Sequence, residues 1–348
     1  MLTPQKILII RLSSLGDVIL TSPVVRCLRK KFPSAQIDFL IKSEYEDLYR
    51  FNPNISSLIE LKSSESEELK LLKEKIRRTR YDIIIDLHNS LRSKYLRFFS
   101  MARYTRVITK RILKRILLVK FGVNLFGDNE SVVDRYFETI EKFGVINDNR
   151  GLEIFIPDEA LEITKTLAER VNLSRYQQVY GFVPSAKHFT KRWLPERFVE
   201  LGHTLTRESN SKILIFGGKE EQEYCDDITQ MINSRSGANV SENLAGKLNL
   251  LETAAMLDYC NLIVTNDSGL MHLAAARKKK MVAIFGSTVS HLGFAPCGTE
   301  SSIVEAASVL CRPCSHIGRS ECPKKHFNCM KEISVESVVS EVRRLMAK

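Results

Sequence analysis

Short apolar runs alternate with helical patterns along the whole chain, and this alternation limits the folds that it can adopt. Buried β-strands are predicted at residues 7–10, 37–41, 83–87 and 106–108 in the first half, and at 179–183, 212–216, 262–264 and 281–285 in the second. Alternating β and α units with short connections favour parallel sheets covered by helices. We therefore predict an α/β protein with two Rossmann-like domains.

Helices are predicted between these runs, at residues 18–30, 65–80, 158–171, 196–208, 220–233, 250–259, 270–278 and 335–348. A chain of 348 residues is long enough for two domains with complete cores. The boundary is expected near residues 147–155, which gives domains 1–155 and 156–348. The last helix could pack on either domain.

Composition points to a globular protein without a membrane span. Hydrophobic residues make up 44% of the chain and charged residues 27%, both ordinary values. No run of about 18 apolar residues is present. The N-terminus enters the first strand without the basic and apolar regions of a signal peptide, so we expect a cytoplasmic protein.

One segment, residues 261–276, has the pattern of a phosphate-binding strand-to-helix turn. Its apolar run is followed by Asp267, Ser268 and Gly269, and then by an alanine-rich helix that contains His272. Asp and Ser are good N-caps, and Gly lets a ligand approach the backbone. A helix that begins at the carboxyl end of a parallel strand presents N–H groups to anions. The alternative is an ordinary capped turn.

A second polar loop follows the first strand and carries Ser13, Ser14, Gly16 and Asp17. With one glycine it is not a Gly-x-Gly-x-x-Gly fingerprint, which argues against a nicotinamide oxidoreductase. Asp17 could cap the following helix, as Asp often does. The functional alternative is a carboxylate at the edge of the sheet that acts as a base.

A third loop follows the strand at 179–183 and carries Ser185, Lys187 and Lys191. Trp193, the only tryptophan, and Pro195 open the next helix. A lysine here can neutralise a diphosphate as a point charge. A solvated basic loop is the alternative.

The net charge of +11 is concentrated between residues 87 and 127, where the chain has no Asp or Glu. The basic residues of this stretch are Arg92, Lys94, Arg97, Arg103, Arg106, Lys110, Arg111, Lys114, Arg115 and Lys120. Apolar residues alternate with them over 106–120, which predicts a basic amphipathic helix lying on an anionic membrane surface. Nucleic acid and a merely solvated face are the alternatives, and we expect no nucleic acid partner.

Four of the eight cysteines, Cys311, Cys314, Cys322 and Cys329, are close together near the C-terminus. Zinc ligands, disulfides and free thiols are all compatible with this number of cysteines. Only the first pair has the tight spacing of a zinc knuckle, and a cytoplasmic protein disfavours disulfides. Free thiols are favoured over structural zinc.

Together these motifs resemble glycosyltransferase family 9, the ADP-heptose:lipopolysaccharide heptosyltransferases, in its heptosyltransferase II branch. The resemblance rests on residues 13–17, 191–195, 217–221, 243–246, 266–272 and the cysteine-bearing tail. It implies a GT-B fold, in which two Rossmann-like domains with parallel sheets face a central cleft. The N-terminal domain would bind the acceptor and the C-terminal domain the nucleotide sugar.

The resemblance also implies an inverting transfer of heptose from ADP-heptose to the anionic inner core of lipopolysaccharide. Asp17 would be the catalytic base. The expected donor-binding residues are Ser185, Lys191, Glu221, Asp267, Ser268, Gly269 and His272, and the expected acceptor-binding residues are Ser14, Gly16, Asn89, Arg92 and Lys94. No metal or other cofactor is expected. The enzyme would be cytoplasmic and peripheral at the inner membrane. A different nucleotide sugar, or a binding protein without turnover, is the alternative.

Overall fold

The computed structural model describes residues 3–127 and 130–347. The chain forms two compact units, one made of residues 3–111 and 130–155 and the other of residues 112–127 and 156–347. Within the described ranges, no helix combines the length and the apolar character needed to cross a membrane.

The first unit is built on a parallel five-stranded sheet with the strand order β3-β2-β1-β4-β5. The strands are β1 (Lys6–Ile10), β2 (Gln36–Lys42), β3 (Ser57–Leu61), β4 (Ile83–Asp86) and β5 (Tyr104–Val107). The helices are α1 (Leu15–Ile19), α2 (Ser22–Lys31), α3 (Asp47–Arg50), α4 (Ser66–Thr79), α5 (Leu91–Arg97) and α7 (Val132–Ile140). The strand order reverses beside β1, where α/β proteins bind ligands.

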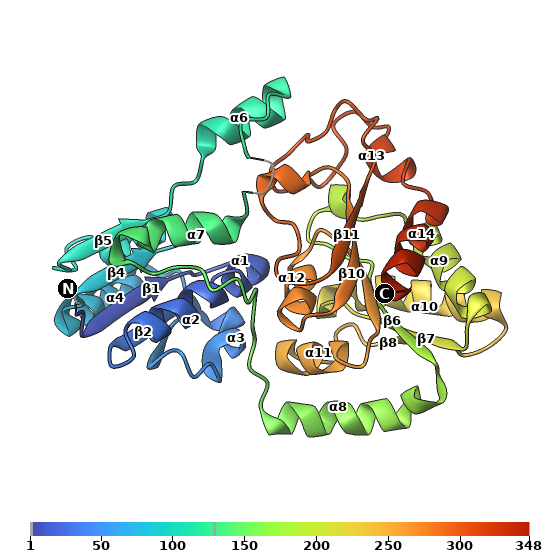
Figure 1. Cartoon of the computed structure of the whole chain (residues 1–348), viewed down its shortest axis with the longest axis horizontal. Coiled ribbons are helices and arrows are strands. Elements are labelled where there is room, and N and C mark those ends of the chain that lie inside the picture. The colour runs from blue at the N-terminus through green and yellow to red at the C-terminus, as the bar shows by residue number, and fades with distance from the viewer. Residues whose placement is uncertain (1–2, 128–129, 348) are drawn as a thin grey trace. The chain divides into compact units, whose positions relative to one another are not determined.

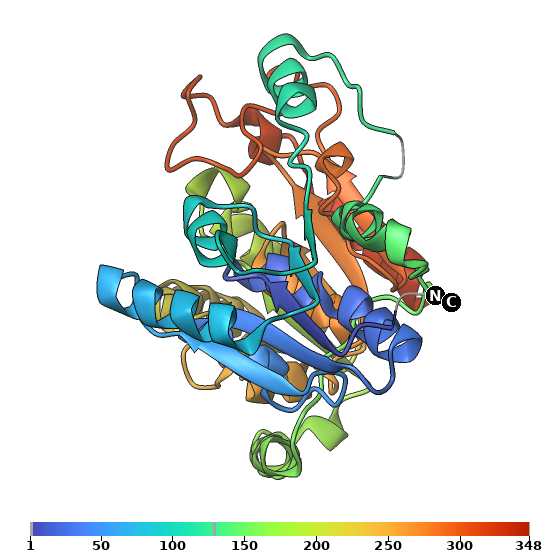
Figure 2. The same cartoon turned by 90° about the vertical axis from the view of Figure 1, so that its left-hand side faces the viewer.

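Helices cover both faces of this sheet. On one face Leu8, Ile10 and Ile84 pack against Leu72 and Ile76 of α4, and α4 lies along the strands in Figure 2. On the other side α2 and α7 are packed together. Because side chains alternate along a strand, a sheet covered on both faces reads as a continuous apolar run.

The predicted helix at 18–30 is wrong, because the structure divides it into α1 and α2. Pro23 lies in the first turn of α2, where its missing N–H costs nothing. A helix continuing through from α1 would place the proline ring against the carbonyl of the preceding turn. The Thr21 hydroxyl at the break donates to the carbonyl of Val18 and is 2.7 Å from the Tyr49 hydroxyl.

The single basic helix predicted over 106–120 is also wrong. Strand β5 ends at Val107, and α6 (Ile112–Phe121) begins only after Arg111, whose left-handed backbone (φ 52°) separates the two elements. Leu118 of α6 and Phe126 pack with Leu292, so this segment clusters with the second unit.

The second unit contains a parallel six-stranded sheet with the order β11-β10-β9-β6-β7-β8. The strands are β6 (Gln178–Val183), β7 (Ser211–Ile215), β8 (Ser241–Asn243), β9 (Leu262–Asn266), β10 (Lys280–Phe285) and β11 (Ser301–Glu305). The helices are α8 (Asp158–Arg170), α9 (Pro195–Glu208), α10 (Gln222–Ser236), α11 (Leu250–Leu257), α12 (Gly269–Ala276), α13 (Asn328–Lys331) and α14 (Val335–Met346).

The last helix packs within the second unit rather than on the N-terminal one. Val338 and Val342 of α14 enter the core that α9 and α10 form over one side of the sheet, whereas α11 and α12 lie on the other side of it (Figure 1). Helix α14 ends at Met346, and Lys348, included in the predicted helix, lies outside the described residues.

The strands that hydrophobic runs failed to predict, β3, β8 and β11, all lie at sheet edges. Edge strands can carry more polar residues and fewer apolar ones: β8 has the sequence Ser-Glu-Asn, and β11 is only half-buried along its length. The apolar signal of such a strand is therefore weaker than that of a central strand.

Candidate functional site

Asp17 lies on the first turn of α1, directly after the central strand β1. Its carboxylate accepts a hydrogen bond from the Ser14 hydroxyl at 2.8 Å, and Ser14 is the N-cap of the helix. Gly16 is buried beneath this turn, while Ser14 is exposed. The side chain of Asp17 retains 22% of its accessible surface. The carboxylate therefore serves the helix start and still reaches solvent.

Arg11 is a charged partner of Asp17 that the sequence analysis did not select. Its guanidinium is 2.7 Å from Oδ1 of Asp17. It also donates to the backbone carbonyls of Ser13 and Leu87 and lies 5.8 Å from the ring centre of Tyr136. One buried arginine thus joins the Asp17 loop to the loop after β4.

The loop after β4 is held by the fully buried Asp86. Its carboxylate accepts hydrogen bonds from the backbone N–H groups of His88 and Asn89 and pairs with Arg97 at 2.9 Å. The Asn89 amide donates to the carbonyl of Ile108 at 3.0 Å. Asp86 therefore sets the conformation of the loop after β4. Arg11 connects this loop to Asp17, because it contacts both Leu87 and Asp17.

His88 is a residue of this loop that the sequence analysis did not select. Burial, and then the nearby Arg11, lowers its pKa to about 4, so the imidazole is neutral at physiological pH. Its Nδ1 atom is buried without a hydrogen-bond partner. An unpaired buried polar atom is unusual and marks a candidate for ligand contact.

The two basic residues predicted to bind the acceptor, Arg92 and Lys94, lie on α5 and are exposed. Ser93 and Leu96 form the buried side of the same helix. The structure therefore groups Ser14, Gly16, Asp17 and Asn89 around the ends of β1 and β4, and presents Arg92 and Lys94 to solvent.

In the second unit, β9 leads directly into α12, as the sequence predicted. Ser268 is the N-cap of this helix, and its hydroxyl oxygen is buried without a hydrogen-bond partner. Gly269 is the first helical residue. The N–H groups of a helix's first turn have no partners within the helix and attract anions. A buried hydroxyl without a partner beside such N–H groups marks a candidate for ligand contact.

Lys191 lies next to this helix start and is paired with Asp267. Its amine is 2.7 Å from Oδ2 of Asp267, and both side chains are largely buried. The Thr288 hydroxyl donates to the same carboxylate at 2.7 Å. Asp267 therefore holds Lys191 in place beside the N-terminus of α12, and Thr288 is a third member that sequence reasoning missed.

Asn266 ties the Lys191 loop to the sheet. Its side chain accepts a hydrogen bond from the backbone N–H of Trp193 at 3.0 Å and donates to the carbonyl of Pro184 at 2.8 Å. The Trp193 indole is fully buried and donates to the carbonyl of Ile333. Both ends of the loop are thus fixed by a single amide.

The remaining predicted donor residues lie at the same edge of the second sheet. Ser185 lies two residues after the end of β6 and is buried. Glu221 accepts a hydrogen bond from the backbone N–H of Gly218 at 2.7 Å, after β7. His272, on α12, is buried with its ring 6.4 Å from that of Phe294. Each residue comes from a loop or helix that follows a parallel strand.

The cysteine-bearing segment, residues 311–329, packs behind the Lys191 loop. The backbone N–H of Thr190 donates to the carbonyl of Arg319 at 3.1 Å, and the N–H of Arg319 donates to the Thr190 hydroxyl at 2.8 Å. The Ser287 hydroxyl also donates to Thr190. The ring centres of Phe189 and Phe327 are 5.0 Å apart in a stack. The segment supports the residue next to Lys191.

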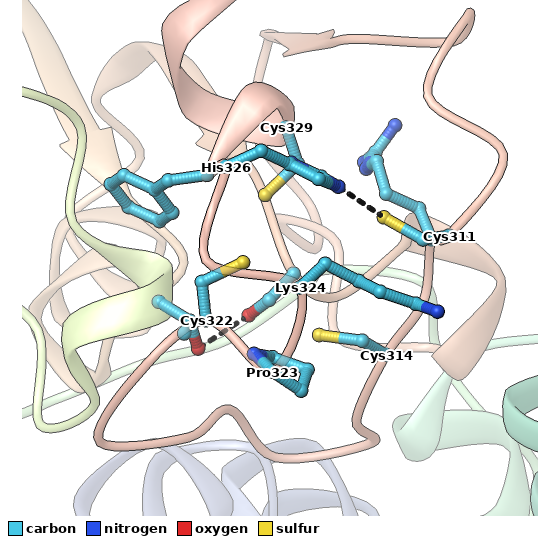
Figure 3. A pocket seen from close by; sticks show the side chains of 11 residues that line it. Cys311, Cys314, Cys322, Pro323, Lys324, His326 and Cys329 are labelled. Carbon is cyan, nitrogen blue, oxygen red and sulfur yellow. Dashed lines mark hydrogen bonds between the residues drawn. The ribbon is translucent and has the colours of Figure 1, made fainter.

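The four cysteines of this segment surround one small pocket (Figure 3). The sulfur of Cys311 is 3.8 Å from Nε2 of His326. All four thiols are free, and burial raises the pKa of Cys329 to about 11. Across residues 3–127 and 130–347, no three Cys, His, Asp or Glu side chains are arranged to hold a metal ion.

Comparisons with known proteins identify the class to which this fold belongs. A glycosyltransferase family 9 protein from Veillonella parvula superimposes with a TM-score of 0.79 and 25% identity, covering 99% of this chain and 97% of that one. The structure of E. coli ADP-heptose LPS heptosyltransferase II superimposes with a TM-score of 0.74 and 22% identity, covering 98% of each chain. The predicted fold, two Rossmann-like parallel sheets of the GT-B type, is confirmed.

The family follows from the sequence match. Residues 69–325 match the model of glycosyltransferase family 9 (heptosyltransferase), which is more than half of the chain, so the chain belongs to this family of glycosyltransferases. The matched range contains Lys191 and Asp267 but begins after Asp17. A relative from Campylobacter jejuni, lipooligosaccharide heptosyltransferase 2, is 28% identical over 337 residues and is covered to 95%, as is this chain.

Proposed function

We propose that this enzyme transfers a heptose from ADP-heptose to the inner core of lipopolysaccharide, with inversion at the anomeric carbon. The family and the heptosyltransferase 2 relative support this substrate class. The observation that carries the proposal is the anion-binding arrangement of the second unit. There, the buried Ser268 hydroxyl without a partner and the amine of Lys191 lie at the start of α12.

This arrangement suits a diphosphate leaving group. When the bond between the anomeric carbon and the ADP oxygen breaks, its electron pair stays on ADP and negative charge grows on the diphosphate. Positive charge that is already in place stabilises this transition state without further reorganisation. Lys191, held by Asp267, supplies that charge, and the N–H groups at Gly269 complement it. Ser185 and His272 would line the diphosphate, and Glu221 would accept a hydrogen bond from the ribose.

In the first unit, Asp17 would act as the general base. It takes the proton of the acceptor hydroxyl as the hydroxyl oxygen attacks the anomeric carbon. Arg11 fixes the carboxylate at 2.7 Å. Ser14, Gly16 and Asn89, together with the exposed Arg92 and Lys94, would contact the anionic acceptor.

We also propose that the enzyme is peripheral at the cytoplasmic surface of the inner membrane, through α6. This helix exposes Ile112, Leu113, Ile116 and Phe121, and Lys120 is exposed at its end. Arg111, counted among the membrane-binding charges from the sequence, is engaged by Glu130 and Glu138 instead. The contact would therefore depend more on apolar side chains than the sequence pattern indicated.

A donor screen tests the proposed function. ADP-heptose should raise the melting temperature above the values obtained with other ADP-sugars and with UDP-sugars, because a ligand stabilises the state that binds it. Heptose-deficient lipopolysaccharide should then receive heptose from ADP-heptose. Transfer from a different nucleotide sugar, with none from ADP-heptose, would contradict the donor assignment. Stabilisation without any transfer would indicate a binding protein.

A further inference from the structure

The segment from Leu91 to Arg103, named here the α5 patch, places large apolar side chains in water. Their exposed fractions are 87% for Leu91, 38% for Tyr95, 55% for Phe98, 67% for Phe99 and 79% for Met101. Isolated exposed apolar residues are common, but several in one short segment indicate a surface that is covered in use.

The α5 patch is anchored to the core of the first unit. Leu96 is fully buried in the core with Leu72 and Ile76, and Ser93 and Ser100 are also buried. Arg97 pairs with the buried Asp86 at 2.9 Å. The exposed side chains therefore belong to an ordered scaffold.

The backbone of the patch keeps an unfavourable conformation at two of the exposed residues. Phe99 has a φ of 61° and Met101 a φ of 60°. The left-handed region costs a side chain that is neither Gly nor Asn about 1 kcal/mol or more. The rings of Phe98 and Phe99 are packed edge to face with their centres 4.2 Å apart. Backbone strain of this kind clusters at ligand clamps and other functional sites.

The charged residues of the α5 patch itself are all basic. Arg92, Lys94 and Arg103 are exposed within it. The amine of Lys73, from α4, lies 4.4 Å from the ring centre of Tyr95 and 5.4 Å from that of Phe99. No acidic residue occurs between residues 87 and 127. A partner that complements both the apolar and the basic side chains of the patch has an apolar interior and an anionic surface.

We propose that the α5 patch inserts its apolar side chains into the interface of an anionic lipid bilayer, with its basic residues at the headgroups. Aromatic and apolar side chains flanked by Lys and Arg are the composition of interfacial membrane contacts. A second copy of the chain is a poorer partner, because a symmetric contact would place Arg92, Lys94 and Arg103 against the same residues of the other copy. The inference rests on the proposed function in one respect. If the acceptor is anchored in a lipid bilayer, the first unit, which carries Asp17, has a reason to contact the membrane.

The test variant combines Phe98→Ser, Phe99→Asn and Met101→Asn. Asparagine tolerates the left-handed backbone, so the loop should keep its shape. The matched control is Leu161→Ser with Ile163→Ser on α8, two exposed apolar residues in a helix that begins with Asp158 and Glu159. Sedimentation with phosphatidylcholine vesicles, with and without phosphatidylglycerol, measures binding. The test variant should bind the anionic vesicles at least about ten-fold more weakly, whereas the control should bind like the wild type.

A second reporter is Phe99→Trp, because the single native tryptophan is fully buried. Its emission should shift to shorter wavelength when anionic vesicles are added. Unchanged emission, or a test variant that binds as tightly as the wild type, would overturn the proposal. A wild-type dimer that the test variant converts to monomer would overturn it in favour of self-association.

These outcomes remain separate from the proposed function. Transfer to a soluble, delipidated acceptor should be the same for the test variant and the wild type. If the wild type fails to transfer heptose at all, the proposed function fails while the vesicle result stands. If serine substitutions at Ile112, Leu113 and Ile116 abolish vesicle binding but the α5 variant does not, the membrane contact belongs to α6 and the α5 proposal is wrong.

Discussion

Asp17 carries both a structural and a proposed catalytic task. One carboxylate oxygen accepts a hydrogen bond from Ser14, and the other pairs with Arg11. The capping interaction explains why an Asp fits this position without any chemistry. The arginine pairing orients the carboxylate, and the remaining solvent exposure leaves it open to an acceptor hydroxyl, as the proposed role of a base requires.

Asp17→Asn should separate these two tasks. The amide oxygen can still accept a hydrogen bond from Ser14, and the affinity for ADP should change little. Because the substitution removes the negative charge that pairs with the buried Arg11, the melting temperature should fall moderately. Transfer should fall by about 10² to 10⁴-fold, the usual contribution of a general base. Steady-state kinetics and thermal melting measure the two effects. Near-normal transfer would reduce Asp17 to a helix cap.

Lys191→Ala should weaken ADP binding and slow transfer by about 10²-fold. This is the usual effect of removing one group that stabilises the charge of a transition state. It also leaves the buried Asp267 with Thr288 but without its cation, so stability should fall as well. Lys191→Arg should restore stability more than transfer, because a planar guanidinium does not replace a point charge. Equal ADP affinity in the wild type and the alanine variant, measured by calorimetry, would exclude the role.

His88 gives the first unit a pH dependence. Its pKa is about 4 in the folded chain, whereas the unfolded chain takes up a proton near pH 6.5. Stability is therefore lost as the pH falls from about 6.5 towards 4, by about 3 kcal/mol in full. His88→Gln should flatten the fall in unfolding free energy over this window, measured by denaturant titration. An unchanged pH profile would mean that His88 titrates normally.

At the scale of elements, the proposed donor site involves contacts from the cysteine-bearing segment as well as α12. Gly318 shows these contacts most directly. Its φ is 104°, and a Cβ atom there would lie 2.6 Å from Cβ of His188, three residues before Lys191. The glycine is required both by the backbone and by the close approach of the two loops.

Gly318→Ala should therefore displace the Lys191 loop and raise the KM for the donor. The control is Gly237→Ala, which also has a positive φ (64°) but no atom within 4 Å of the added Cβ. The control should lose only about 1 kcal/mol of stability and keep its KM. If both variants have the same KM, the contact between the two loops has no part in donor binding.

The edge strands and α6 show where local patterns failed at this scale. Strands β3, β8 and β11 lie at sheet edges, and their mixed polarity hides the strand signal. Interior strands such as β1 and β10 are buried throughout most of their length, and the apolar runs predicted them. The basic pattern of 106–120 was genuine, but it spans the end of a strand, a turn at Arg111 and a helix.

At the scale of the whole molecule, the net charge of +11 should make membrane association depend on salt. Each basic residue near an anionic surface contributes about 1 kcal/mol, and the screening length shrinks from about 10 Å at 0.1 M salt to about 3 Å at 1 M. Binding to phosphatidylglycerol vesicles should weaken as salt rises. The part of the affinity that comes from apolar contacts should remain at high salt. Complete loss at high salt would indicate a purely electrostatic contact.

The sequence by itself determined the fold class, the interior strands and the loops that carry Asp17, Lys191 and Ser268. These features depend on local periodicity and on capping residues, and both can be recognised from a few neighbouring positions in the sequence. Only the tertiary structure decided the partners of those residues. Arg11 reaches the carbonyl of Leu87, 76 positions away, and Thr190 bonds to Arg319, 129 positions away. Such contacts depend on the path of the chain through the sheets, and no local pattern encodes that path.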